Sequence, residues 1–141
     1  MKQKIFLDHI GIATANLDTS SPFWRLIGLQ NDGEDEVVSD QGVTTRFFST
    51  SDFEKNINPP KIELLEPTSE DTPIGKFLSK RGPGVQQICF RVEDLEQMIR
   101  TMLDNDVVMI DESPRLGAGG KKIAFVHPKS TGGVLVELTQ Y

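Results

Sequence analysis

The chain has 141 residues, with 15 Lys or Arg against 21 Asp or Glu, so its formal net charge is −6. This length suits one domain, or two small modules that share a core. Because no basic cluster is longer than a Lys-Lys pair, we expect neither nucleic acid nor a membrane surface as a partner. The single cysteine, Cys89, and the absence of an apolar segment of membrane-spanning length favour a cytoplasmic protein.

The first half of the chain reads as a strand, a helix and further strands. Alternation predicts a strand over residues 4–13, and a short helix follows, capped within residues 18–20 and with Pro22 in its first turn. The later elements are a strand over residues 43–48, a polar hairpin loop over residues 49–60 and a strand over residues 61–65. Thr72-Pro73 then opens a second helix, and we place a module boundary across residues 66–84.

The second half repeats the order of strand and helix. A strand over residues 85–92 precedes the clearest amphipathic helix, which Asp94 caps with Gln97 at the reciprocal position. The last predicted elements are a brief strand over residues 107–110 and, within residues 114–138, a glycine loop, a strand over residues 123–126, a tight turn and a final strand.

Two glutamates occupy unusual positions in predicted strands. Glu137 lies in the otherwise apolar final strand, where a buried carboxylate is costly unless something pairs with it. The segment KIELLEP places Glu63 in the same local pattern. The segments DHIGIATANL and QQICFRVEDL also align, so that His9 corresponds to Gln87, and each half then reads as one βαβββ unit. The repeat predicts that these four side chains face one cavity.

The four residues have the chemistry of a divalent metal site. One imidazole nitrogen, two carboxylates and an amide oxygen make an oxygen-rich, fairly hard ligand set, and two carboxylates neutralise a divalent ion. The alternative is that each residue is an isolated polar group on a strand face open to solvent. The other histidine, His127, lies in the turn HPKSTGG without a repeat partner, which indicates a structural role.

Six blocks of sequence resemble a known superfamily. They are LDHIGIA at 7–13, DQGV at 40–43, KIELLEP at 61–67, TPIGKFLSKRG at 72–82, ICFRVEDL at 88–95 and PRLGAGGKKIAFVHPKSTGGVLVEL at 114–138. On these blocks the chain resembles the vicinal oxygen chelate superfamily (glyoxalase, bleomycin-resistance and extradiol-dioxygenase proteins), and within it the methylmalonyl-CoA epimerases. The last block is the most specific.

The resemblance implies an α+β fold. One domain would span residues 1–141, with βαβββ modules over residues 1–70 and 83–141 forming a cupped, barrel-like mixed sheet around a metal site. The implied reaction interconverts (2R)- and (2S)-methylmalonyl-CoA by proton abstraction at C2. The implied cofactor is a divalent ion (Co, Mn, Ni, Mg or Zn), and the implied partner is an acyl-CoA substrate. Superfamily members are often dimers, so a homodimer is compatible with the resemblance.

Carried over residue by residue, the metal ligands of the family fall on His9, Glu63, Gln87 and Glu137. The epimerases usually read HHI where this chain has Gln-Gln-Ile, so glutamine replaces a ligand histidine at Gln87. Asp40 stands where the family has a glutamate proposed as a catalytic base, which makes Asp40 and Glu137 the implied pair for proton transfer. Both departures fall on the chemistry and leave the scaffold unchanged.

Other readings of the same residues stay open. A glyoxalase I-like lyase acting on a hemithioacetal would use the same four residues, and a non-catalytic ligand-binding protein would follow if the amide of Gln87 weakened the metal site. An extradiol dioxygenase is disfavoured, because its iron normally needs two histidines and only His9 occupies such a position. Lys121 and Lys122 could meet CoA phosphates, although solvated lysines on a hairpin are the simpler interpretation.

Overall fold

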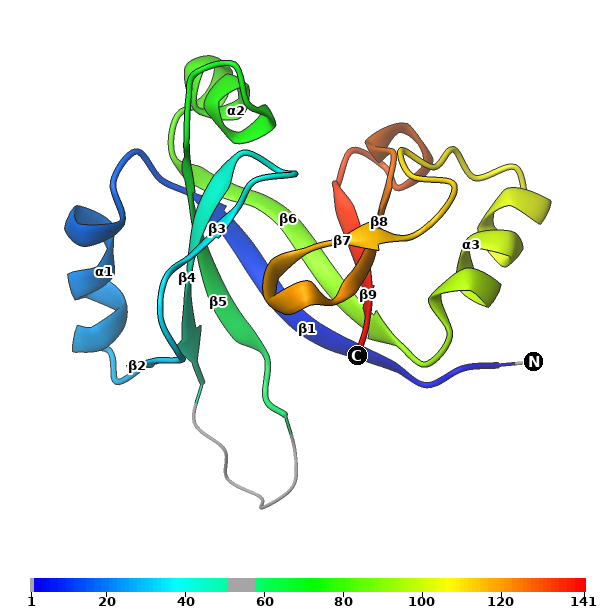
Figure 1. The fold of residues 1–141 in the computed structure, drawn as a ribbon, viewed down its shortest axis with the longest axis horizontal. Coiled ribbons are helices and arrows are strands. Elements are labelled where there is room, and N and C mark those ends of the chain that lie inside the picture. The colour runs from blue at the N-terminus through cyan, green and yellow to red at the C-terminus, as the bar shows by residue number, and fades with distance from the viewer. Residues whose placement is uncertain (1, 51–57) are drawn as a thin grey trace. The chain divides into compact units, whose positions relative to one another are not determined.

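The structure is a computed structural model that describes residues 2–50 and 58–141. The chain divides into two compact units. The N-terminal unit is His9–Gln86, and the C-terminal unit is Gln87–Tyr141 together with the residues up to Asp8. The boundary between the units therefore falls inside strands β1 (Ile5–Ala13) and β6 (Gly84–Val92) (Figure 1). Most of the loop predicted over residues 49–60 lies outside the described residues.

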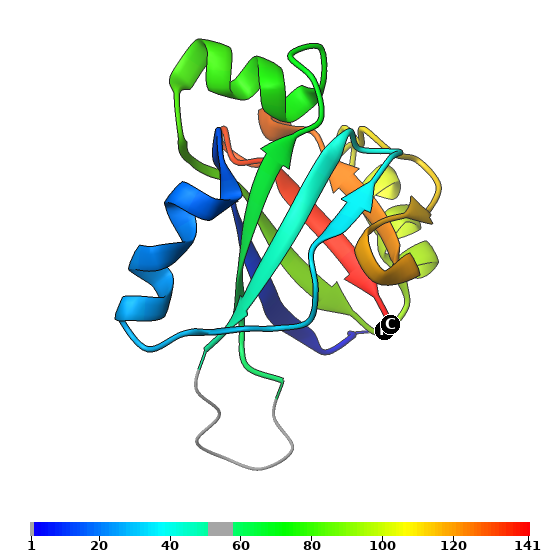
Figure 2. The same ribbon diagram turned by 60° about the vertical axis from the view of Figure 1, so that its left-hand side comes forward.

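The strands of the N-terminal unit pair in the order β2-β4-β5-β1, with β3 on β4. Here β1 is parallel to β5 (Lys61–Pro67), and β5 is antiparallel to β4 (Val43–Ser49). In turn β4 is antiparallel to β2 (Gln30–Asn31) and β3 (Glu36–Val38). Helix α1 (Leu17–Leu26) packs on this sheet (Figure 1 and Figure 2), where Leu17, Phe48 and Leu64 form a buried apolar cluster.

The C-terminal unit repeats this connectivity. Strand β6 is parallel to β9 (Val136–Gln140), β9 is antiparallel to β8 (Lys122–Val126), and β8 is antiparallel to β7 (Arg115–Leu116). Helix α3 (Leu95–Asp104) packs on one face of the sheet, where its core includes Ile99, Val126 and Leu138. In both units the first strand runs parallel to the last, so the pairing follows the predicted βαβββ pattern. The module limits at 1–70 and 83–141 stay a prediction.

Two helix caps follow the local sequence, and a third departs from it. Thr72 caps α2 (Pro73–Arg81), accepting a hydrogen bond from the Gly75 N–H at 3.1 Å, and Asp94 caps α3 through the Gln97 N–H at 3.0 Å. For α1, however, the predicted cap within residues 18–20 is wrong. Asn16 caps this helix instead, because its side-chain oxygen reaches the Thr19 N–H at 3.0 Å. The helix thus begins earlier, and Pro22 lies inside it and not in its first turn.

The reciprocal capping position of α3 is also filled differently. Gln97 was predicted to accept from the Asp94 N–H, but this N–H donates to Oε1 of Gln3 at 2.8 Å. The same Gln3 oxygen accepts from the Glu93 N–H at 3.0 Å, and the Gln3 amide donates to Gln97. A residue far away in the sequence therefore satisfies the helix end, which a local pattern cannot reveal.

The strand predicted over residues 107–110 is wrong. Only one bridge, from Met109 to Val126, forms in this segment. The N–H groups of Ile110 and Asp111 both donate to the Phe125 carbonyl, at 2.9 and 3.2 Å, so the chain bulges and a regular ladder cannot continue. Two 3-10 turns follow, at Ala118–Gly120 and Pro128–Ser130.

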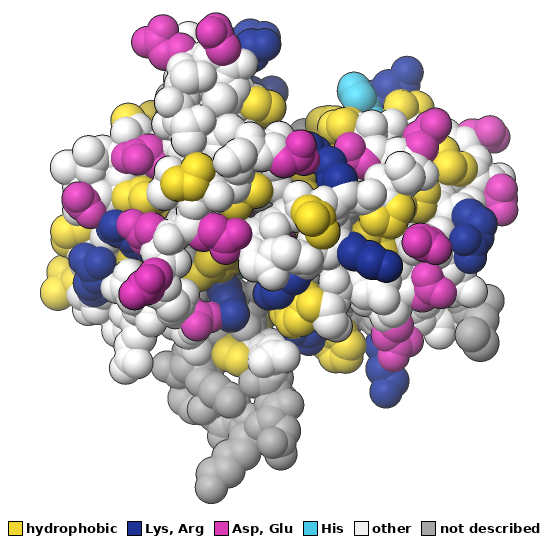
Figure 3. Space-filling model, in the orientation of Figure 1, with side chains coloured by type: hydrophobic (Ala, Val, Ile, Leu, Met, Phe, Trp, Pro, Cys, Tyr) yellow, Lys and Arg dark blue, Asp and Glu magenta, His cyan; other side chains and the backbone are white. Residues whose placement is uncertain are grey.

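On the face seen in Figure 3, acidic and basic side chains are interspersed and no broad basic patch appears. Within residues 2–50 and 58–141, every helix is too short or too polar to span a bilayer.

Candidate functional site

His9 and Glu63 meet in the N-terminal unit. The parallel pairing of β1 and β5 places Gly11 directly opposite Glu63, and His9 lies two residues earlier on the same face. Both side chains are buried, with 5% and 4% of their surface exposed. The His9 Nε2 atom lies 3.2 Å from the Glu63 Oε1 atom. A predicted pair, more than fifty residues apart in the chain, is therefore in contact.

The geometry of this pair suits a metal ion. Two donors bound at right angles to an ion with bonds of about 2.1 Å lie about 3 Å apart, which is close to the separation observed. The charge of a buried carboxylate has to be compensated, either by a protonated imidazole or by a bound cation. Phe47 on β4 pairs with Glu63. Its ring contacts the His9 ring edge-on, with 5.5 Å between the ring centres, and restricts the orientation of the imidazole. The donor set present in this unit thus fits a divalent cation.

Gln87 and Glu137 occupy the matching positions in the C-terminal unit. Both side chains are buried, with 4% and 5% exposed. Cys89 lies directly opposite Glu137 in the parallel pair of β6 and β9, and Gln87 lies two residues before Cys89 on the same face. Helix α3 covers the other face of this sheet, against Leu138. The two candidate ligands therefore share the face that α3 leaves uncovered.

The repeat extends to the strand register. Each glutamate lies between a residue of the first strand of its unit and a phenylalanine of the neighbouring antiparallel strand. The matching triplets are Gly11, Glu63 and Phe47 in the N-terminal unit and Cys89, Glu137 and Phe125 in the C-terminal unit. The two halves differ in the side chain beside the glutamate, which is absent at Gly11 and a thiol at Cys89. The sequence repeat is thus also a repeat of side-chain positions.

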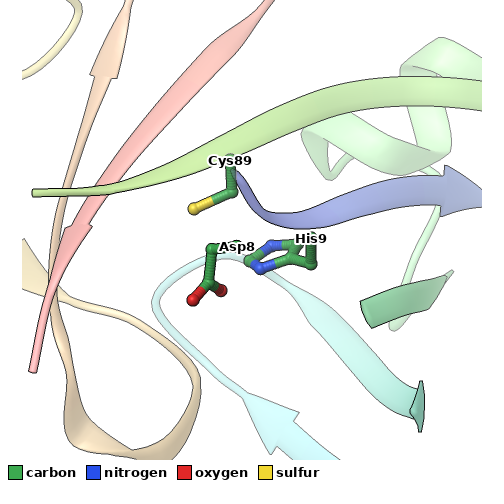
Figure 4. Close-up of side chains that lie close together, drawn as sticks. All are labelled: Asp8, His9 and Cys89. Atoms are coloured by element: carbon green, nitrogen blue, oxygen red, sulfur yellow. The ribbon is translucent and has the colours of Figure 1, made fainter. Parts of the chain in front are cut away.

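Asp8 and Cys89 lie close together in the C-terminal unit, a proximity that the sequence patterns did not indicate. The Asp8 carboxylate and the Cys89 thiol offer donor atoms within 4.8 Å of each other, and Figure 4 shows both side chains, with His9 as the residue that follows Asp8 on β1. Asp8 also accepts a hydrogen bond from the Tyr141 hydroxyl at 2.6 Å. Burial, together with this hydrogen bond, raises the pKa of Tyr141, so the phenol stays protonated at neutral pH. An acidic residue inside an apolar strand was the available signal.

Asp40, the predicted base, is exposed on the turn between β3 and β4. The Gly42 N–H donates to the Ser39 carbonyl at 3.2 Å, which closes the turn. The Gly42 carbonyl accepts from the Thr68 N–H at 2.9 Å, so the turn is also tied to the segment after β5. Gly42 has a φ of +65°, a conformation that L side chains rarely adopt. The position of Asp40 therefore depends on a glycine.

We expect Gly42→Ala to destabilise the protein by about 1–3 kcal/mol and to displace the turn that carries Asp40. The added Cβ would clash with Cγ2 of Thr72. Thr72 cannot rotate away without losing the cap of α2, a contact worth about 1 kcal/mol. Urea unfolding of this variant and of Gly33→Ala measures the effect, since Gly33 has a similar φ of +76° but open space around its Cβ. Equal destabilisation of the two variants would contradict the proposed clash.

An arginine anchors the segment that leads to this turn. Arg46 on β4 donates to both carboxylate oxygens of Asp35 at 2.7 Å, to Ser21 at 2.8 Å and to Asp18 at 3.1 Å. The hydrogen bond from Arg46 holds the pKa of Asp35 below its ordinary value, and the same contact raises the pKa of Arg46. The connection between β2 and β3 is thereby fixed to α1.

The remaining residues singled out from the sequence have local contacts. The Nδ1 atom of His127 accepts from the Lys129 N–H at 3.1 Å and caps the turn at Pro128–Ser130, as a structural role predicts. The Lys121 ammonium lies 3.7 Å from the centre of the Tyr141 ring. Lys122 begins β8 and is exposed.

A sequence profile of the Glyoxalase/Bleomycin resistance protein/Dioxygenase superfamily matches residues 8–125. The chain belongs to this superfamily. It is 39% identical to the uncharacterized protein YqjC of Bacillus subtilis, over 95% of this chain and 91% of that protein. It is 38% identical to the mitochondrial methylmalonyl-CoA epimerase of Dictyostelium discoideum, over 95% of this chain and 77% of that protein.

A solved structure shows the same similarity. Streptomyces coelicolor methylmalonyl-CoA epimerase in complex with 2-nitronate-propionyl-CoA matches with a TM-score of 0.88 at 37% identity, over 96% of this chain and 93% of that one. These relatives confirm the predicted resemblance, the α+β fold of the superfamily and the assignment to enzymes of the racemase and epimerase class. The roles of the individual site residues stay predictions.

Proposed function

We propose that this protein is a metal-dependent epimerase that interconverts (2R)- and (2S)-methylmalonyl-CoA. The observation that carries the proposal is the buried contact between His9 and Glu63, repeated in register by the buried side chains of Gln87 and Glu137. The similarity to epimerases over nearly the whole chain supports the substrate, an acyl-CoA with a carboxylate at C2.

The proposed ligands of the ion are His9, Glu63, Gln87 and Glu137. Their carboxylates supply two negative charges, which match a divalent cation such as Co, Mn, Ni, Mg or Zn. When bound, such an ion supplies a Lewis acid that lowers the energy of negative charge on the thioester oxygen. His9 and Glu63 are held for this role by the parallel pairing of β1 and β5 and by the ring of Phe47.

The proposed proton transfers belong to Asp40 and Glu137. One carboxylate takes the C2 proton, and the electron pair of the broken C–H bond moves into the thioester carbonyl. The other, in its protonated form, donates a proton to the opposite face of C2, which inverts the centre. Asp40 is one methylene shorter than glutamate, so the anchored turn at Gly42 must place its backbone close to the substrate.

Deuterium exchange tests the proposed function. With Co²⁺ or Mn²⁺ added, we expect protein in D₂O to incorporate deuterium at C2 of methylmalonyl-CoA and to equilibrate the two epimers. Protein treated with a chelator should lose both activities and regain them when metal is restored. Exchange no faster than in buffer, with metal bound in stoichiometric amount, would rule the function out.

A further inference from the structure

A row of four residues crosses the C-terminal sheet next to Glu137. Register pairs Arg91 with Thr139, Thr139 with Ile123, and Ile123 with Arg115, so the row runs from β6 to β7. Because paired residues share a face, and because this row is two residues from the one that contains Glu137, both arginines project from the face of Glu137. The sequence analysis assigned no role to either arginine.

The Arg115 guanidinium lies over Phe125, which is the strand neighbour of Glu137. Its central carbon lies 5.5 Å from the centre of the Phe125 ring, and Phe125 is the β8 residue paired with Glu137. The Nε atom of Arg115 lies 3.2 Å from an oxygen of Asp111. The second oxygen of Asp111 accepts from the Phe125 N–H at 2.8 Å. Arg115 is thus fixed to Phe125 through both its ring and its backbone.

The turn after Arg115 supports the same position. Gly117 approaches Ile123 so closely that a Cβ at this residue would lie 2.8 Å from Cγ2 of Ile123. The Gly117 N–H also donates to the Lys121 carbonyl at 2.9 Å. These contacts hold the short strand β7 against β8, and Arg115 is therefore supported by secondary structure.

Arg91, the other arginine in the row, takes part in a different set of contacts. The Arg91 guanidinium lies between the rings of Phe6 and Tyr141, at 5.0 and 5.1 Å from their centres. It donates to the Tyr141 hydroxyl at 2.7 Å and lies 3.8 Å from Asp8. Its aromatic neighbours hold Arg91 in a structural network, whereas Arg115 lies over Phe125, the residue paired with Glu137.

We propose that Arg115 binds the C2 carboxylate of the substrate and so makes the site selective for acyl-CoA thioesters that carry such a carboxylate. The inference rests on the proposed function and deepens it. A carboxylate base that approaches C2 of a malonyl-type substrate also approaches the negative charge of that substrate. A guanidinium fixed over Phe125, the strand neighbour of Glu137, would offset this repulsion. Arginine suits this task because its planar fork matches a carboxylate and stays charged at any physiological pH.

Binding of two ligands to the full-length protein tests the assignment. We expect wild type to bind methylmalonyl-CoA more tightly than propionyl-CoA, which lacks the carboxylate. Arg115→Met should weaken methylmalonyl-CoA binding by roughly 10- to 100-fold, the range for a lost hydrogen-bonded charge pair, and leave propionyl-CoA binding nearly unchanged. Arg115→Lys, which keeps the charge but loses the fork, should lie between the two. Calorimetry or competition binding measures all the affinities.

Matched variants exclude a general effect of charge. Arg100 is an exposed arginine on α3 of the same unit, and Arg100→Met should keep the wild-type ratio of the two affinities. An unchanged ratio in Arg115→Met, with far-UV circular dichroism like that of wild type, would overturn the assignment of Arg115. Failure of the proposed function is a separate outcome, because wild type would then show no exchange at C2 whatever its binding preference.

Discussion

Glu137→Gln should lower epimerisation of methylmalonyl-CoA by roughly 10²- to 10⁴-fold, the range for loss of a general acid or base. The substitution keeps the volume and an oxygen ligand of Glu137 but removes its charge and its ability to carry the proton. In the proposed mechanism Asp40 would still abstract the proton from one face of C2. We therefore expect deuterium exchange without inversion for one epimer only, measured by mass spectrometry on each pure epimer.

Glu63→Gln is the matched control, because Glu63 holds the equivalent strand position in the N-terminal unit. It is proposed as a ligand without a role in proton transfer. We expect weaker metal binding, a smaller loss of turnover than for Glu137→Gln, and exchange from both epimers once metal is saturating. Equal losses in the two variants, with the same exchange pattern, would show that Glu137 is only a ligand.

Gln87→His should increase affinity for Co²⁺, Ni²⁺ or Zn²⁺ and should raise turnover with these ions. An imidazole nitrogen is a better donor than an amide oxygen for these metals, whereas Mg²⁺ and Mn²⁺ favour oxygen. Even outer-shell partners change metal affinity by about 10- to 100-fold, so a changed ligand should have an effect of at least that size. Metal titration and the C2 exchange assay, run on the same preparations, measure the two effects.

Gln86→His provides the control for this substitution. It introduces the same side chain one residue earlier on β6, where alternation points it to the other face of the strand. We expect little change in metal affinity or exchange. If both histidine variants gained metal equally, or if Gln87→His gained none, the assignment of Gln87 as a ligand would be wrong.

The candidate ligands His9, Glu63, Gln87 and Glu137 could be predicted from the sequence because they occupy matching positions in its internal repeat. A carboxylate in an apolar strand is unusual, and its recurrence at Glu63 and Glu137 links the two halves of the sequence. The caps at Thr72 and Asp94 were equally visible, since a cap depends on residues within one helical turn. At α1 the same reasoning chose the wrong residue, because several neighbouring polar side chains were suitable and only the backbone path selected Asn16.

Contacts between segments that are distant in the sequence could not be predicted from local patterns. The cap supplied by Gln3 and the clamp of Arg46 on Asp35 and Asp18 join residues that no local pattern connects. The bulge that replaces the strand over residues 107–110 also depends on which carbonyl of β8 the chain meets.

The sequence by itself determined the order of the helices and of the longer strands, the repeat, the superfamily and the residue types of the candidate site, because each depends on short-range alternation or on a motif. It did not reveal the short strands β2, β3 and β7. Only the tertiary structure decided the strand register. That register brings the imidazole of His9 to the carboxylate of Glu63, and it places Arg115 over the neighbour of Glu137. Register is set by which apolar faces are buried together, which is a property of the packed sheet and not of any single strand.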